Sequence, residues 1–139
     1  MFKRILVAVD LQHREMTQRT LDAAAGLASA MQSDLRLIHV RFMIERALEY
    51  ISQSISVEEE KAMHAELMAL AQTTGIPGQR LSAVSPIGTI YDQVLTAAKE
   101  FKADLIVTGP HSPSLAKYLL GGNAARIITH AKTSVLVVR

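Results

Sequence analysis

The stretch Ile5-Leu6-Val7-Ala8-Val9 is an unbroken apolar run followed by Asp10. A strand buried on both faces has this pattern, whereas a strand with one solvated face alternates apolar and polar residues. The next periodic segment instead has the i, i+3, i+4, i+7 spacing of one helix face, at Leu21, Ala24, Ala25 and Ala28. The chain therefore opens with a buried strand and a helix that can cover it.

The same two patterns alternate to the end of the chain. Further strands are expected at about 35–40, 80–85, 103–108 and 134–138, and further helices around 63–71, 87–101 and 124–131. This alternation predicts an α/β fold, a doubly wound five-stranded parallel sheet with four helices. A length of 139 residues fits one domain, 1–139. Residues 41–54 follow neither pattern.

Composition excludes several classes of protein. The absence of cysteine rules out disulfides, thiolate metal clusters and a cysteine nucleophile. A net charge of +2 with 4% aromatic residues disfavours nucleic-acid binding. No apolar run approaches the roughly 20 residues that cross a membrane, so we expect a cytoplasmic protein. The five histidines show no H-x-x-x-H spacing, so no metal site is expected.

The loop after the fourth strand contains the most unusual sequence. Ligands of doubly wound sheets bind at the carboxyl ends of the strands, where Gly109 offers a backbone without a Cβ. Further on, Gly122 and Asn123 precede a helix; Asn is a favoured N-cap, and the N–H groups of a first helical turn bind anions. This loop predicts a phosphate site, with an ordinary Gly/Pro-rich loop as the alternative. Neither G-x-x-x-x-G-K-[ST] nor G-x-G-x-x-G is present.

The chain resembles the universal stress proteins over essentially its whole length. The resemblance rests on five blocks: Ile5-Leu-Val-Ala-Val-Asp10, Leu37-Ile-His-Val40, Ala103-Asp-Leu-Ile-Val-Thr-Gly109, Tyr118-Leu-Leu-Gly-Gly-Asn-Ala124 and Ser134-Val-Leu-Val-Val138. It implies an adenine-nucleotide α-hydrolase-like fold. The family's ATP-binding branch carries G-x2-G-x9-G-[S/T/N], which Gly109, Ser112 and Gly122-Asn123 match in spacing. Ser112 replaces the second glycine, as in a similar subgroup that still binds ATP.

The resemblance also implies a role for each position that matches the motif. Asp10 would hold the ribose or the adenine edge, although the residues alone also allow it to brace a turn. Ala8, Val9 and Val40 would surround the adenine. The ribose and phosphates would then contact Gly109, His111, Ser112, Gly122, Asn123 and Ala124. His111 has no acid close in sequence to orient it, which favours a hydrogen bond to phosphate over acid–base chemistry.

Two functions compete at this stage. The first is a small cytoplasmic protein that binds ATP, with or without Mg²⁺, as a regulatory ligand. Hydrolysis would be slow at most, because no Walker lysine or clear general base is visible. The second is a nucleotide-free dimeric interaction module. In both, the apolar segment Val135–Val138 pairs with its copy in a homodimer. An ATP-using enzyme of related architecture is disfavoured, since so short a chain shows no second substrate site.

Overall fold

The structure is a computed structural model that describes residues 1–41, 56–110 and 121–139. Its strands are β1 (Arg4–Ala8), β2 (Asp34–Ile38), β3 (Leu81–Val84), β4 (Leu105–Thr108) and β5 (Ser134–Val137). Its helices are α1 (Arg14–Met31), α3 (Ser56–Gln72), α4 (Ile90–Phe101) and α5 (Gly122–His130), with a short 3-10 turn at Gly78–Arg80. The expected strands and helices are all present, with ends that shift by a few residues.

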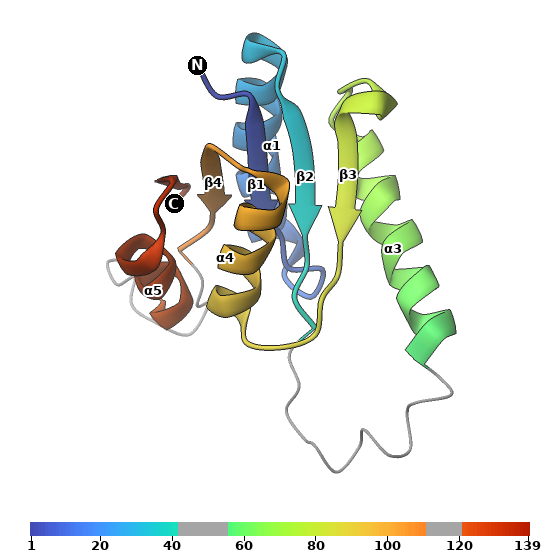
Figure 1. Cartoon of the computed structure of the whole chain (residues 1–139). Helices are drawn as coiled ribbons and strands as arrows, with labels where there is room; N and C mark the ends of the chain where they lie inside the picture. Colours follow the sequence, from blue (N-terminus) through green and yellow to red (C-terminus); the bar gives the residue numbers. More distant parts are fainter. Residues whose placement is uncertain (42–55, 111–120) are drawn as a thin grey trace.

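The five strands are parallel and lie in the order β3-β2-β1-β4-β5. From β1 the chain winds outward through β2 and β3, then crosses back to β4 and β5 on the other side (Figure 1). The predicted doubly wound parallel sheet is therefore confirmed. The reversal of winding falls between β1 and β4, and it is there that such sheets open a crevice at the carboxyl ends of their strands.

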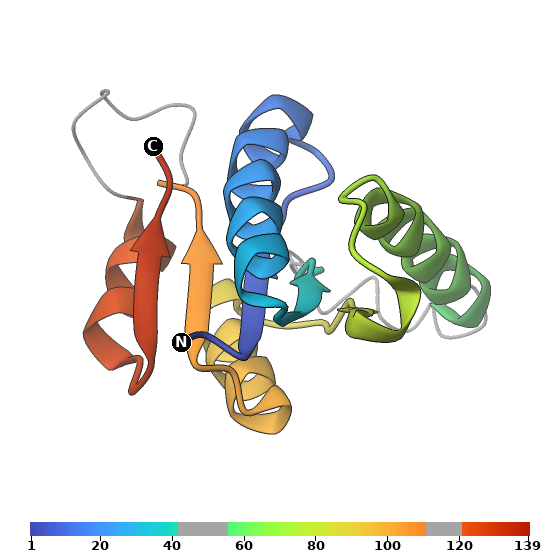
Figure 2. The same ribbon diagram turned by 90° about the horizontal axis from the view of Figure 1, so that it is seen from above.

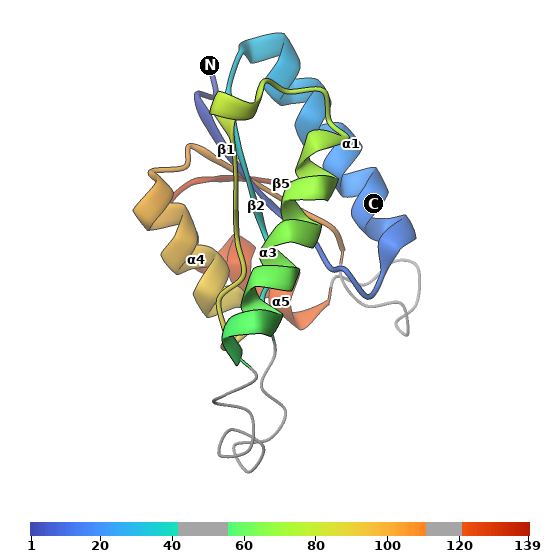
Figure 3. The ribbon, with the colours of Figure 1, turned by 90° about the vertical axis from the view of Figure 1, so that its right-hand side faces the viewer.

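Two layers of helices cover the sheet. Side chains of α1 and α3 share one hydrophobic core with β1 and its neighbours, and side chains of α4 and α5 share a second core on the opposite face. Figure 3 shows α1 and α3 together on one side of the sheet and α4 on the other. Within β1, Ile5 and Val7 belong to the first core and Leu6 to the second, all fully buried. The continuous apolar run is thus explained by burial on both faces.

The start of α4 differs from the prediction. Apolar spacing places Ile87 in the third predicted helix, but α4 begins only at Ile90, after the N-cap Thr89. Ile87 instead forms a parallel bridge with Arg41, and Gly88 adopts a φ of 149°. Because that φ lies outside the helical region, the chain turns at Gly88 before the helix can begin.

The sheet has two edge strands, β3 and β5. Figure 2, seen from above, shows β5 beyond β4 at one end of the sheet. In β5, Val135 packs against the core of α4 and α5, whereas Leu136 is 37% exposed. In the part of the chain that the structure describes, no helix is long and apolar enough to cross a membrane.

Candidate functional site

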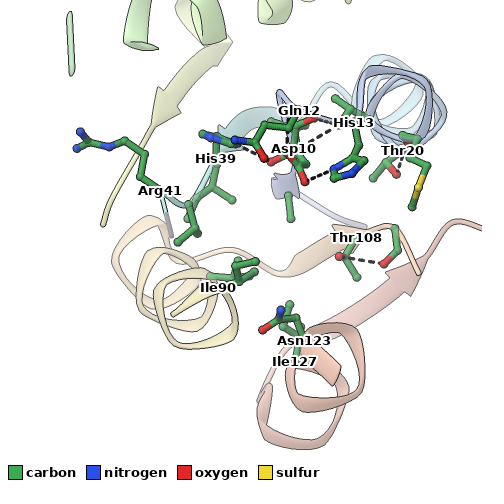
Figure 4. A pocket seen from close by; sticks show the side chains of 18 of the residues that line it. Asp10, Gln12, His13, Thr20, His39, Arg41, Ile90, Thr108, Asn123 and Ile127 are labelled. Atoms are coloured by element: carbon green, nitrogen blue, oxygen red, sulfur yellow. Dashed lines mark hydrogen bonds and ion pairs between the residues drawn. The ribbon is translucent and has the colours of Figure 1, made fainter. Parts of the chain in front are cut away.

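A cavity of about 390 Å³ opens at the carboxyl ends of β1 and β4, where the winding reverses. Its volume lies within the range of small-molecule sites, roughly 300 to 1,000 Å³. Ala8 and Val9 line it at the end of β1, and Thr108 and Gly109 at the end of β4. Figure 4 shows Asp10 and His13 on one side of the cavity and Thr108 and Asn123 on the other.

The turn between β1 and α1 forms the most polar wall. The Asp10 carboxylate accepts the Gln12 N–H at 2.9 Å through Oδ1, and its Oδ2 lies 2.7 Å from Nδ1 of His13. The Asp10 N–H donates to Oγ1 of Thr17 at 2.8 Å, and the same hydroxyl donates to the Asp10 carbonyl at 2.6 Å. Asp10 therefore braces its own turn, which confirms the structural interpretation of this residue. Its contact with a ligand remains a prediction.

The end of β2 supplies the next part of the wall. His39 is 8% exposed, and its Nδ1 lies 3.4 Å from both the Leu11 N–H nitrogen and the Val9 carbonyl oxygen. His39 therefore has hydrogen-bond partners at the end of the strand, and its side chain also borders the cavity. Val40 follows it and is buried.

Apolar side chains close the cavity between the sheet and the helices of the second core. They come from the end of β2, from α4 and from α5, and are Ile38, Val40, Ile90, Val94 and Ile127. All belong to one hydrophobic cluster or pack directly against it. These side chains form an apolar surface of the kind against which a flat, weakly polar ring such as a nucleobase can pack.

The opposite wall is the beginning of α5. The sequence predicts Asn123 as its N-cap, but that prediction is wrong: α5 begins at Gly122, and Gly121 is the N-cap, with φ −61° and ψ 155°. The Gly121 N–H donates to the Pro110 carbonyl at 2.7 Å, and the Gly121 carbonyl accepts the first helical bond from Ala125 at 3.1 Å. These two bonds fix Gly121 in the extended conformation that an N-cap needs.

Asn123 lies in the first turn of α5 and lines the cavity. The N–H groups of Gly122, Asn123 and Ala124 precede the first helical hydrogen bond, so the helix itself supplies no acceptor for them. The side chain of Ala124 is fully buried, whereas Gly122 is exposed, with no atom within 4 Å of the position that a Cβ would occupy. Of these three residues only Asn123 lines the cavity, so the predicted contacts of Gly122 and Ala124 with phosphate remain predictions.

Gly109 packs closely against α1. A Cβ at this position would lie 3.2 Å from Oγ1 of Thr20, so contact with the helix also explains the glycine. His111 and Ser112, predicted to contact the ribose or phosphates, lie outside the described residues. Arg126, on α5, has its guanidinium 5.1 Å from the centre of the Tyr91 ring.

Comparison with known proteins decides the family. The model of the universal stress protein family matches residues 1–139, the whole chain. The chain belongs to the universal stress protein family. It is 31% identical over 145 residues to Universal stress protein G of Shigella flexneri, with all of both chains covered.

Solved structures of the family share the fold of this universal stress protein. UspA from Lactobacillus plantarum superposes with a TM-score of 0.78 at 22% identity, covering 99% of this chain and 97% of the other. A universal stress protein crystallised in complex with cAMP superposes with a TM-score of 0.71 at 24% identity, with the same shares of the two chains covered. The neighbours have the adenine-nucleotide α-hydrolase-like fold that the sequence resemblance implies.

Sequence reasoning missed the contribution of α1 to the site. Residues His13, Met16, Thr17 and Thr20 line the cavity, at the i, i+3, i+4, i+7 spacing of one helix face. The signal was present, because Asp10 and His13 stand three residues apart directly after a buried strand. This face is mostly polar, however, and the apolar pattern that locates helices begins only at Leu21. Among the described residues, no group of three or more His, Asp or Glu could hold a metal ion.

Proposed function

We propose that this universal stress protein acts in the cytoplasm and binds ATP in the cavity at the switch point, where the nucleotide serves as a regulatory ligand with slow hydrolysis at most. One observation carries the proposal: a single cavity joins apolar walls, an acidic side chain and the start of a helix. Those three surfaces suit a base, a ribose and a phosphate chain in turn. A family member crystallised with cAMP supports an adenine nucleotide as the class of ligand.

The adenine is assigned to the apolar walls, beside Ala8, Val9 and Val40. Asp10 lines the cavity next to these walls and is assigned to the ribose hydroxyls, because an ionised carboxylate accepts hydrogen bonds from hydroxyl groups. The phosphates are assigned to Gly109 and to the first turn of α5, whose N–H groups favour anions. This order places the charged end of the ligand next to backbone donors and the ring next to apolar side chains.

Mg²⁺ fits this arrangement as a companion of the phosphates. It keeps several water ligands and commonly binds through phosphate oxygens and one or two carboxylates, so it needs no cage of protein ligands. We assign no side chain to it.

The first experiment is to purify the protein without added nucleotide, denature it and separate the supernatant on a nucleotide-resolving column. We expect about one adenine nucleotide per chain, and reloading of emptied protein by ATP with Mg²⁺. Protein that is empty and also fails to bind added ATP contradicts the proposal and favours the nucleotide-free interaction module.

We also propose a homodimer through β5. The Val138 N–H donates to the Thr108 carbonyl at 2.9 Å, so alternate residues of the last strand point their backbone groups toward β4. Because the N–H and C=O groups of successive residues in a strand point to alternate sides, those of Val135 and Val137 point toward the open edge. A second copy that pairs there removes an edge that otherwise invites aggregation, and it covers the exposed Leu136.

Val137→Pro tests this dimer, because proline removes a donor at the open edge while leaving the ladder to β4 in place. Val137→Ala is the control, since it shortens the same side chain but keeps the N–H. By light scattering we expect a dimer for the wild type and for Val137→Ala, and a monomer for Val137→Pro. A Val137→Pro protein that stays dimeric contradicts pairing through β5.

A further inference from the structure

The apolar pattern of β2 is broken at one position, Arg36. It lies between Leu35 and Leu37, which are fully buried in the core of α1 and α3, so its side chain points to the opposite face of the sheet, toward α4. A charged side chain costs solvation free energy in a strand that is packed on both faces, which makes an arginine unusual there. We propose that Arg36 anchors a second ligand site, one that binds the carboxylate of a small organic acid and is separate from the cavity proposed for ATP.

A second cavity of about 720 Å³ lies beside Arg36 and runs over the open edge of β3, from α3 to α4. Its volume is within the range of small-molecule sites, roughly 300 to 1,000 Å³. Figure 3 is seen from the side of β3 and shows α3 and α4 on opposite faces of the sheet. Among the described residues, none lines both this cavity and the one at the switch point, so a ligand here leaves the proposed nucleotide site open.

The guanidinium of Arg36 is held in place by contacts within the protein. Its Nε donates to Oγ of Ser82 at 2.8 Å, and Ser82 is the partner of Arg36 in the register of β2 and β3. Its Cζ lies 4.3 Å from the centre of the Phe101 ring at the end of α4, a cation–π contact. Because these contacts already restrict the side chain, a ligand loses less affinity to the ordering of this arginine.

The same contacts leave donors of Arg36 for a ligand. The bond to Ser82 uses only the N–H on Nε. Within the part of the chain that the structure describes, Nη1 and Nη2 have no hydrogen-bond acceptor, and no Asp or Glu forms an ion pair with Arg36. The contact with Phe101 involves the face of the guanidinium, whereas its N–H bonds lie in the plane. That planar fork of donors matches the two oxygens of a carboxylate.

The charges around the cavity favour a ligand with a single negative charge. Among the described residues, its charged lining consists of two cations, Arg36 and Lys61, and two acids, Glu60 and Glu100. Glu60 already pairs with Arg41, at 3.5 Å. The two acids repel a multiply charged anion such as a triphosphate, whereas a monocarboxylate adds only one charge beside two cations. Small apolar side chains for the body of such an acid are present too, at Ala65, Ala83, Val84 and Ala97.

The test uses the whole ¹⁵N-labelled protein and sodium benzoate, which joins a carboxylate to a flat apolar body. Benzamide has the same shape without the charge, and inorganic phosphate has the charge without the body. We expect benzoate to shift the Arg36 Nε–H signal and the amide signals of Ala83, Val84 and Thr96 saturably, with a Kd on the order of 1 mM. Benzamide and phosphate should each bind at least about tenfold more weakly.

Arg36→Met removes the charge and the donors but keeps an unbranched side chain against the Phe101 ring, and benzoate affinity should fall at least about tenfold. Arg4→Met is the matched control, because the Arg4 guanidinium lies 5.9 Å from the centre of the same ring but Arg4 does not line the cavity. It should keep the wild-type affinity. Ser82→Ala retains Arg36 and removes only its anchor, so affinity should fall about threefold.

Several results would overturn the proposal, and none of them depends on whether the protein binds ATP. A wild type without saturable shifts does so, as does benzoate that shifts the signals of Val40 and Gly109 instead, because it is then bound in the switch-point cavity. Benzamide or phosphate that binds as tightly as benzoate shows that no carboxylate is recognised. A folded Arg36→Met protein with wild-type affinity removes Arg36 from the site. If that variant does not fold, an Arg36 Nε–H signal that benzoate leaves unshifted in the wild type overturns the assignment instead.

Discussion

The two polar walls of the cavity differ in how they are built. The turn between β1 and α1 presents side chains, and each is fixed by a bond to another group of the same turn: Asp10 to Gln12 and His13, and Thr17 to the backbone of Asp10. The first turn of α5 presents backbone N–H groups together with one side chain, that of Asn123, since Gly122 has no side chain and that of Ala124 is buried. The first wall depends mainly on the identity of its residues, and the second depends mainly on where the helix begins.

This difference determines what a substitution can do at each wall. At the start of α5, the N–H donors remain for every residue except proline, so a side chain has to obstruct the approach to remove the proposed anion site. At the turn, each side chain is both a potential ligand contact and a part of the local structure. Substitutions there are therefore expected to change binding and stability together.

The largest effect is expected from Gly122→Val. A Cβ at this position meets no atom within 4 Å, so the fold accepts the side chain, which then stands in front of the donors of the first turn. We expect ATP affinity to fall by at least about 100-fold, equivalent to roughly 2.8 kcal/mol, with the unfolding midpoint unchanged. Isothermal titration with ATP and Mg²⁺ measures the loss.

Gly26→Val is the matched control for that substitution. Gly26 is an exposed helical glycine of α1 that also has no atom within 4 Å of its Cβ position, and it does not line the cavity. Binding should stay at the wild-type value. Unchanged affinity in Gly122→Val would remove the start of α5 from the phosphate site.

Asp10→Ala is expected to have the next largest effect. Comparing its affinities for ATP and AMP shows whether this wall contacts the nucleoside or the phosphates. If Asp10 holds the ribose, ATP and AMP should lose affinity alike, by at least about tenfold, because a hydrogen bond to a charged group contributes roughly 1.5–3 kcal/mol. Unfolding free energy should fall as well, since the Gln12 N–H and His13 lose their partner. Asp22→Ala, an exposed acid of α1, should leave both affinities intact. A loss confined to ATP would place Asp10 at the phosphates.

The fold was predictable because each of its elements has its own periodicity. The apolar run of β1 and the i, i+3, i+4 spacing of α1 need no knowledge of distant residues, and their alternation leaves few possible topologies. The errors arise where a distant or conformational constraint acts. Asn123 is displaced from the N-cap because Gly121 bonds to Pro110, on the far side of residues 111–120. Ile87 is outside α4 because Gly88 turns the chain.

The candidate site was predictable only at positions that match the family's sequence blocks. Gly109 and Asn123 line the cavity, Gly122 and Ala124 do not, and His13, Thr17 and Thr20 were missed. Hydrophobic spacing identifies the face of a helix that enters the core, and it says nothing about which polar face meets a cavity. The contact between Asp10 and His13 could not be predicted either. Their separation of three residues allows the two side chains to meet, but it does not determine that they do.

The smallest effect on binding, and a clear one on stability, is expected from Thr17→Val. Thr17 is 3% exposed, and its hydroxyl both accepts the Asp10 N–H and donates to the Asp10 carbonyl. Valine keeps the shape but leaves both backbone groups without this partner, which should lower the unfolding free energy by about 1–3 kcal/mol in urea. Thr129→Val makes the same change on α5, where the exposed hydroxyl donates to the Ala125 carbonyl at 2.8 Å, and should cost under about 0.5 kcal/mol. Equal losses of unfolding free energy in the two variants would mean that the Thr17 side chain does not hold the turn between β1 and α1. The difference between the two walls would then have lost its main support.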